Sequence, residues 1–197
     1  MGKGATIHID IAPPKGLVEK ALRELAHIKD GAPRAMSAAL NKTATGAKTE
    51  IKRIVAAEYF ISQKDAGSTL SIQKASPGDL EAKIISAGPV IPLIKFRVSR
   101  KAPPTPKRGV KAKVKRQGGG GIAAEGGRKG FLATMSSGHT GVFVRTNKKR
   151  LPVKQLMGPA IPSMIDKHLP EINAKVQVRM EKNLEHEIDR IEKGFGK

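Results

Sequence analysis

The chain has 197 residues, which fits one domain, and 39% of them are hydrophobic, enough for a modest core. It carries 37 Lys and Arg against 17 Asp and Glu, and the net charge of +20 favours a polyanion or an acidic protein surface as partner. The absence of Cys excludes disulfides and thiolate metal sites. No apolar run approaches the roughly 20 residues that a membrane-spanning helix needs. The first 12 residues also lack the pattern of a signal peptide.

Periodicity predicts a strand and then two helices at the start of the chain. Isoleucines alternate with polar residues over 6–12, which indicates a strand. Apolar residues recur at helical spacing over 14–28 and again over 33–57, where many of them are Ala. We therefore expect an antiparallel helical hairpin over 13–58, in which small side chains let the two helices approach closely.

A change to a two-residue period predicts a β-sheet over 69–156. Ser62 and Asp65 have the form of a capping box, so a short helical turn is expected before the sheet. The alternating runs that follow lie at 69–75, 80–84, 94–98, 110–115, 131–135, 141–146 and 151–156. Such alternation is typical of antiparallel strands with one buried and one solvated face.

Residues 95–154 hold most of the positive charge. They contain 17 Lys and Arg and a single acidic residue, Glu125, and so carry +16 of the net +20. Seven of the 14 residues from 117 to 130 are Gly, which predicts a flexible basic loop over 100–130. Lysines that alternate with small apolar residues are expected to point away from the sheet. The expected DNA- or partner-facing basic surface comprises Lys111, Lys113, Lys115, Arg116, Arg128 and Lys129.

The last part of the chain predicts one long helix over 159–193. Apolar residues recur every three or four positions from Ile161 to Ile191. At 1.5 Å per residue this helix extends about 45 Å, so part of its apolar stripe is expected to contact a neighbouring subunit. We interpret the whole chain, 1–197, as a single α+β domain. The hairpin and the long helix pack on a mainly antiparallel sheet that carries a basic, Gly-rich extended loop.

No stretch of the sequence carries a catalytic or metal-binding pattern. The five histidines are not at ligand spacing. Ser136, Ser137 and His139 lie together, but no nucleophile elbow surrounds them, and 138–141 is interpreted as a tight turn. The four glycines at 118–121 lack the Lys and the Ser or Thr that a Walker loop requires. We expect no enzymatic activity, no metal and no cofactor.

Two interpretations of the basic centre remain open from the residues alone. It can contact the DNA backbone, where each neutralised phosphate adds about one unit of salt dependence, or it can dock on acidic neighbours. Sequence-specific recognition is not expected, because the chain has no basic recognition helix, zinc finger or aromatic platform. Membrane binding is disfavoured because the basic segments lack aromatic anchors.

Five short sequence segments, taken together with their order along the chain, form a specific pattern. FLATM-SSGHTGVFVR and LPVKQLMGPAIPSMI precede the last helix, and YFIS-x-KD, SIQKAS and IPLIKF come before them. This order resembles the prophage minor tail protein Z family of tailed bacteriophages. The likeness covers roughly 15–184, and the Gly-rich insertion at 118–127 departs from it. Its turn and strand residues here are Gly138, His139, Gly141, Val142, Phe143 and Arg145.

The resemblance implies a structural virion protein with an α+β fold, no enzymatic chemistry and no cofactor. It implies tail completion at the head-proximal end of the tail, as a neck ring needed for head–tail joining and genome passage. The expected partners are further copies of the chain in a hexameric ring, the tail tube, terminator and head–tail connector proteins, and genomic DNA contacted without sequence specificity. The expected location is the virion, after assembly in the host cytoplasm. The alternative is a stand-alone basic, architectural nucleic-acid-binding protein.

Overall fold

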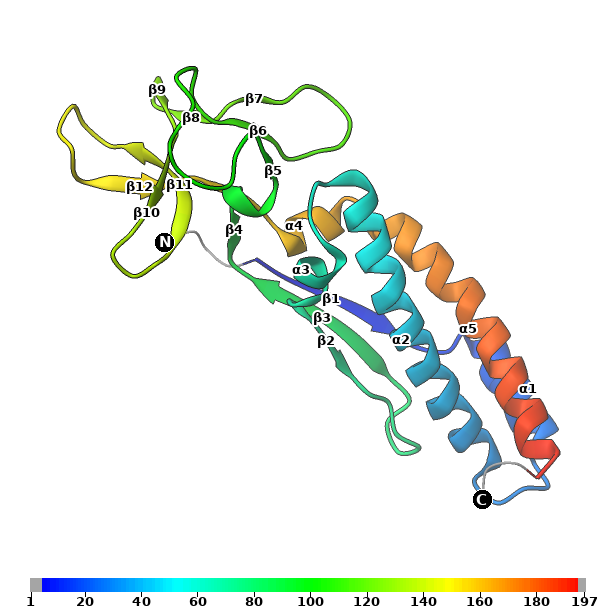
Figure 1. Cartoon of the computed structure of the whole chain (residues 1–197). Helices are drawn as coiled ribbons and strands as arrows, with labels where there is room; N and C mark the ends of the chain where they lie inside the picture. Colours follow the sequence, from blue (N-terminus) through cyan, green and yellow to red (C-terminus); the bar gives the residue numbers. More distant parts are fainter. Residues whose placement is uncertain (1–4, 195–197) are drawn as a thin grey trace.

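The computed structural model describes residues 5–194, which form an elongated molecule with a helical end and a β-rich end (Figure 1). The predicted domain, 1–197, includes residues 1–4 and 195–197, which lie outside the described residues. Helices make up 40% and strands 28%, and the strand pairs are antiparallel. This composition agrees with the predicted α+β class.

The helical end contains a three-stranded antiparallel sheet in the order β1-β3-β2. Its strands are β1 (Ala5–Ile11), β2 (Leu70–Gln73) and β3 (Ala82–Gly88). Ile9 of β1 and Ile72 of β2 both lie opposite Ile84 of β3, so the apolar side chains of the three strands share one face. The strands expected at 6–12, 69–75 and 80–84 are therefore present.

Helices cover the apolar face of this sheet (Figure 1). They are α2 (Gly31–Glu58) and α4 (Ile161–Asp166), with α5 (Leu169–Glu192) packed on α2, and α1 (Lys15–Glu24) packed on α2 and α5. α1 ends earlier than predicted, and the main partner of α2 is α5, which runs antiparallel to it. The apolar stripe of α5 is buried within the chain. The expectation that this stripe contacts a neighbouring subunit is therefore wrong.

The long helix predicted over 159–193 is interrupted between α4 and α5. Pro170 has no N–H and its ring crowds the carbonyl four residues earlier, so a continuous helix cannot pass through it. The chain instead makes a turn, in which the amide of His168 donates to the carbonyl of Ile165 at 2.8 Å. With 24 residues, α5 extends about 36 Å.

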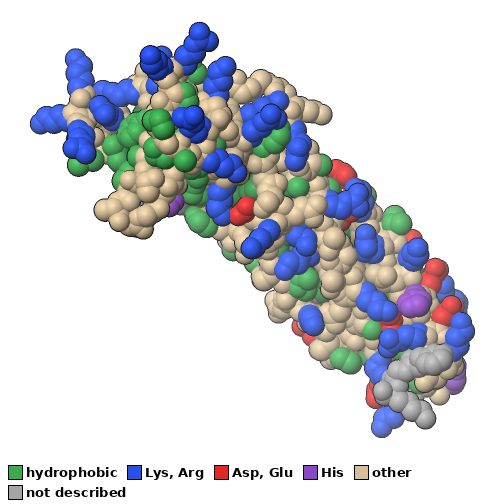
Figure 2. Space-filling model, viewed as in Figure 1, with side chains coloured by type: hydrophobic (Ala, Val, Ile, Leu, Met, Phe, Trp, Pro, Cys, Tyr) green, Lys and Arg blue, Asp and Glu red, His purple; other side chains and the backbone are tan. Residues whose placement is uncertain are grey.

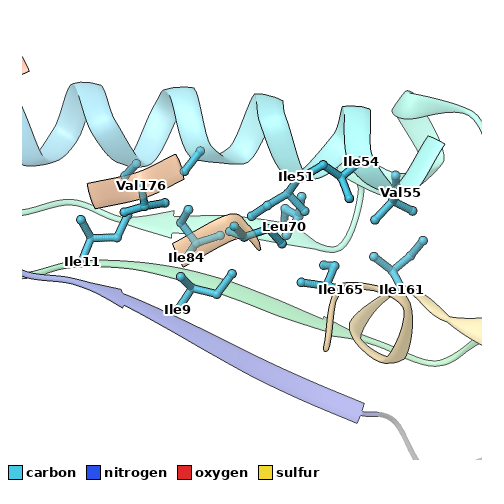
Figure 3. Packing of buried hydrophobic residues seen from close by; sticks show 14 of the residues in the cluster. Ile9, Ile11, Ile51, Ile54, Val55, Leu70, Ile84, Ile161, Ile165 and Val176 are labelled. Atoms are coloured by element: carbon cyan, nitrogen blue, oxygen red, sulfur yellow. The ribbon is translucent and has the colours of Figure 1, made fainter. Parts of the chain in front are cut away.

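One hydrophobic core joins the sheet to the helices. Figure 3 shows isoleucines from β1 and β3 facing branched side chains of α2, with α4 beneath its C-terminal turns. The labelled residues are Ile9, Ile11, Ile51, Ile54, Val55, Leu70, Ile84, Ile161, Ile165 and Val176. β-branched side chains fit both surfaces, since they favour strands and lose little further freedom on packing.

The β-rich end is built from several small sheets, which differs from the single sheet predicted over 69–156. Its strands are β4 (Val90–Pro92), β5 (Arg97–Val98), β6 (Lys111–Lys113), β7 (Gly121–Ile122), β8 (Ala124–Glu125), β9 (Arg128–Lys129), β10 (Phe131–Thr134), β11 (Thr140–Arg145), β12 (Val153–Gln155) and β13 (Met157–Ala160). They form the sheets β5-β6-β7 and β10-β11-β12 and the pairs β4-β13 and β8-β9.

The run expected as a strand at 94–98 begins instead with a 3₁₀ turn, η1 (Leu93–Lys95). Pro92 cannot donate a ladder hydrogen bond, and the chain turns there so that Phe96 is buried. The Phe96 ring lies directly over Gly158 of β13. The β1-β3-β2 sheet therefore does not extend through residues 93–98.

The predicted flexible loop over 100–130 contains ordered strands, β6 to β9. The amide of buried Ala123 donates to the carbonyl of Val110 at 2.7 Å, and the amide of Gly130 donates to Ala123 at 2.6 Å. These bonds fix the Gly-rich segment to the strands beside it. The glycines thus permit close backbone approach as well as turns.

The predicted capping box starts the short helix α3 (Gln63–Gly67). The hydroxyl of Ser62 accepts from the amide of Asp65 at 3.0 Å and donates to its carboxylate at 2.6 Å. Lys95 also binds this carboxylate, at 2.6 Å. The ammonium of Lys95, with the Ser62 hydroxyl, lowers the pKa of Asp65. α3 thereby links the helical end to the β-rich end.

Candidate polyanion-binding surface

The β-rich end carries a large excess of unneutralised positive charge. Of the 17 Lys and Arg in 95–154, three form ion pairs, which join Lys95 to Asp65, Lys115 to Glu58 and Lys154 to Glu125. The other 14 have no carboxylate within 4.0 Å among the described residues. Figure 2 shows the resulting concentration of blue side chains at this end.

The rest of the chain, by contrast, is close to neutral, with 20 Lys and Arg against 16 Asp and Glu outside 95–154, and some of these charges pair between the helices. Lys175 of α5 binds Glu50 of α2 at 2.7 Å and Glu171 at 2.9 Å. The hydrogen bond from Lys175 lowers the pKa of Glu50, although partial burial opposes it. Lys42 of α2 binds the buried Glu187 of α5 in the same way. In Figure 2, red side chains lie among the blue ones at the helical end.

Strands β5 and β6 form a positively charged groove. Arg97 of β5 lies directly opposite Lys113 of β6, and Ser99 follows on the same face beside Lys111. The residues that line the hollow between them are Arg97, Val98, Ser99, Lys111, Ala112, Lys113 and Gly120, and we call it the cationic groove. Two of the six predicted surface residues, Lys111 and Lys113, therefore line one site.

Three cations surround the ring of Phe60 at one end of this groove. The guanidinium carbons of Arg97 and Arg116 lie 5.1 and 4.8 Å from the ring centroid, and the ammonium of Lys113 lies 5.6 Å from it. The sequence analysis missed Arg97 and Phe60. Arg97 could have been found from its position between the apolar residues Phe96 and Val98, whereas nothing in the sequence marks Phe60.

Lys115 and Arg116, also predicted as surface residues, make contacts that hold the two ends of the molecule together. Lys115 binds Glu58 at 2.6 Å, and His168 contacts the same carboxylate. Hydrogen bonds from Lys115 and then from His168 lower the pKa of Glu58, and the bond to Glu58 raises the pKa of Lys115. The charge of Lys115 is thus neutralised within the chain.

Arg116 caps the C-terminus of α2. Its amide donates to the carbonyl of Glu58 at 2.7 Å, and its Nε donates to the carbonyl of Ala56 at 2.8 Å. A cation at this position also complements the negative end of the helix dipole. The remaining guanidinium nitrogens are still available to a ligand, because Arg has five N–H donors.

Arg128 and Lys129 lie on the β8–β9 hairpin and do not line the cationic groove. Both side chains are exposed. The Nη1 atom of Arg128 donates to the carbonyl of Thr146 at 2.7 Å, which ties the hairpin to the end of β11. The structure therefore divides the six predicted residues among a groove, a helix cap with its ion pair, and a separate hairpin.

Comparison with known families decides what kind of protein carries this surface. The sequence profile described as prophage minor tail protein Z matches residues 15–192 of the 197. The chain belongs to the prophage minor tail protein Z family. No curated protein and no solved structure gives a significant match to it. The family is one of phage tail structural proteins, which points to the virion as its location.

The family match covers both ends of the molecule, from the start of α1 to the end of α5. A structural tail family suggests a protein that is not an enzyme. Within residues 5–194, no group of three or more His, Asp or Glu side chains is placed to hold a metal ion. In the same range, no helix has the length and apolar character to cross a membrane.

The residues that carry the likeness to the Z family build the β10–β11 hairpin. Gly138 has φ +79°, and its amide donates to the carbonyl of Met135 at 2.9 Å, so the turn lies at 135–138. The turn predicted at 138–141 is placed too late, because β11 already begins at Thr140. Gly141 is the first buried residue of β11. A Cβ at this position would lie 2.8 Å from the side-chain nitrogen of Gln155 and 3.0 Å from the Phe143 ring. Small size at this position is required by packing.

The other family residues complete the same sheet. Val142 and Phe143 are buried, and the His139 ring lies edge-on to Phe143 with centroids 6.4 Å apart. The guanidinium of Arg145 lies 5.6 Å from the centroid of Phe131. The structure thus gives these family residues packing contacts within β10-β11-β12.

Proposed function

We propose that this protein completes the phage tail at its head-proximal end, where it is needed for head–tail joining and genome passage. The match to the minor tail protein Z family over residues 15–192 carries this proposal. The charge distribution supports it, because a strongly basic surface attracts a dense polyanion such as DNA. The β-rich end has such a surface, and the helical end does not.

The proposed assembly is a ring of identical subunits, with six as the expected number. Its neighbours would be the tail tube and terminator proteins on one side and the head–tail connector on the other. Genomic DNA would pass through the lumen and be contacted without sequence specificity. Assembly would take place in the host cytoplasm before incorporation into the virion.

Deletion of the gene from a phage that encodes this chain tests the proposal. Electron microscopy of the lysate is expected to show unjoined heads and tails, or joined particles that do not deliver DNA. The titre should return when the parental chain is supplied in trans. Normal infectious particles in the absence of the protein would overturn the proposal.

The 14 unpaired cations also favour a second candidate, a stand-alone architectural DNA-binding protein. Sedimentation of the purified chain, with duplex binding at several salt concentrations, distinguishes the two. A monomer that binds duplex tightly and with steep salt dependence supports the second candidate. A closed ring that binds weakly supports the first.

A further inference from the structure

The cationic groove places like charges against each other without an anion from the chain between them. Arg97 and Lys113 are directly opposite in the β5–β6 pairing, an arrangement that destabilises a strand pair. Arg116 brings a third cation to the same Phe60 ring. Among residues 5–194, no carboxylate lies within 4.0 Å of these three side chains. Their mutual repulsion would be relieved by an anion from outside the chain.

The shape of the groove fits an oxyanion carried on a bulky molecule. The Ser99 hydroxyl lies at its wall, where it accepts from the Lys111 amide at 3.1 Å. Gly120 approaches β6 so closely that a Cβ would lie 3.1 Å from the Ala112 carbonyl oxygen. At Gly118, Gly119 and Gly121 a Cβ would meet nothing within 4 Å. The rim is therefore low and open, and a large ligand can reach the cations at the base.

We propose that the cationic groove binds the phosphodiester backbone of duplex DNA. This deepens the proposed function, on which it rests for the presence of DNA beside the protein. A duplex carries one negative charge per roughly 1.7 Å of its axis. This suits a groove lined by Arg97, Lys111 and Lys113 at an end of the molecule where the one acidic residue of 95–154, Glu125, is already paired with Lys154. An acidic protein patch of mixed charge matches this uniform surface less well.

The geometry favours duplex over single-stranded DNA, and backbone contacts over base readout. Single-strand binding uses aromatic faces on which bases stack, but three cations already surround the Phe60 ring. Base readout usually requires a helix or a β-ribbon that enters a groove of the duplex. The strands here are two and three residues long. We therefore expect binding that is independent of sequence.

Fluorescence anisotropy with the full-length protein tests this assignment. The probes are two 25-base-pair duplexes of unrelated sequence, measured between 50 and 200 mM salt. The groove variant is R97Q/K113Q, and the matched control is R23Q/K182Q, which removes the same charge from exposed positions of the helical end. Circular dichroism verifies the fold of each variant. A milder variant, Lys111→Gln, changes an exposed side chain of the groove and provides the test if the double variant does not fold.

The groove variant is expected to bind both duplexes about tenfold more weakly at 0.1 M salt, with the slope of log K against log salt reduced by about two. K111Q should reduce the slope by about one, and the control should leave it unchanged. Equal losses in the groove variant and the control would overturn the assignment, because net charge alone would then explain binding. Tighter binding to polyglutamate or to a single strand of equal charge would also overturn it.

The duplex-binding experiment and the gene deletion can fail independently of each other. If deletion leaves phage infectious while R97Q/K113Q loses duplex binding, the tail-completion proposal fails and the DNA-binding site stands. If deletion abolishes infectivity while the groove variant binds like the parent, the site is wrong and the tail role stands.

Discussion

Gly158→Ala tests the close contact between the Phe96 ring and β13 within the β-rich end. A Cβ at this position would lie 2.4 Å from Cε2 of Phe96 and 3.0 and 3.1 Å from two further ring atoms. Carbon atoms pack at about 3.5–4.0 Å, so the ring or β13 must move by about 1 Å. Phe96 is only 1% exposed, so its ring is enclosed by other residues. Overpacking of this kind costs about 1–3 kcal/mol.

Urea denaturation followed by circular dichroism measures this loss. Gly16→Ala is the matched control, because a Cβ there meets nothing within 4 Å and Ala favours the helix by up to about 1 kcal/mol. Phe96→Leu should cost less stability in the Gly158→Ala background than in the parent, with a coupling energy of about 1 kcal/mol. If Gly158→Ala unfolds at the parental urea concentration, or if the two changes are additive, the close contact does not determine the stability.

Three further predictions concern the helical end. Glu58→Gln should lower the stability at pH 7. The deficit should shrink as the pH falls below 4.5, the ordinary pKa of Glu, because the pKa of Glu58 is lowered in the folded protein and its contribution to stability is lost on protonation. Unfolding curves from pH 3 to 7 measure this dependence, and a deficit that stays constant would contradict it. Asn41→Ala removes two 2.9 Å hydrogen bonds to the backbone of buried Ala75 and should cost about 1–3 kcal/mol in urea denaturation. Leu184→Ala should cost about 2–5 kcal/mol in the same assay, whereas the exposed Val178→Ala should change stability by less than about 0.5 kcal/mol.

Local sequence patterns predicted the helices and strands that bury one regular apolar face in the core. The strand of alternating isoleucines, the long Ala-rich helix and the apolar stripe of α5 are present because each buries one face in the core. The break before α5 was readable from Pro170, which the continuous stripe obscured. The 3₁₀ turn before Phe96 was not readable, since it depends on the space over Gly158, more than 60 residues later in the chain.

The candidate site was predicted by composition but not by geometry. Alternation correctly placed Lys111 and Lys113 on an outer face of β6. It could not show that Lys115 meets Glu58, a partner at the end of another element. Nor could it bring Arg97 and Phe60 together, because tertiary packing alone joins β5, β6 and the end of α2. Charge counts therefore identified the more basic end of the molecule and only part of the cationic groove.

The net charge of +16 on residues 95–154, against +4 on the rest of the chain, gives the protein a large electric dipole along its length (Figure 2). In the field of a polyanion such a molecule experiences a torque, so it turns its β-rich end toward the polyanion before contact. When copies are related by a rotation axis, the components of their dipoles perpendicular to that axis cancel and the parallel components add. If the long axis of each subunit has a component along the rotation axis, a closed ring of this chain would have one rim more positive than the other.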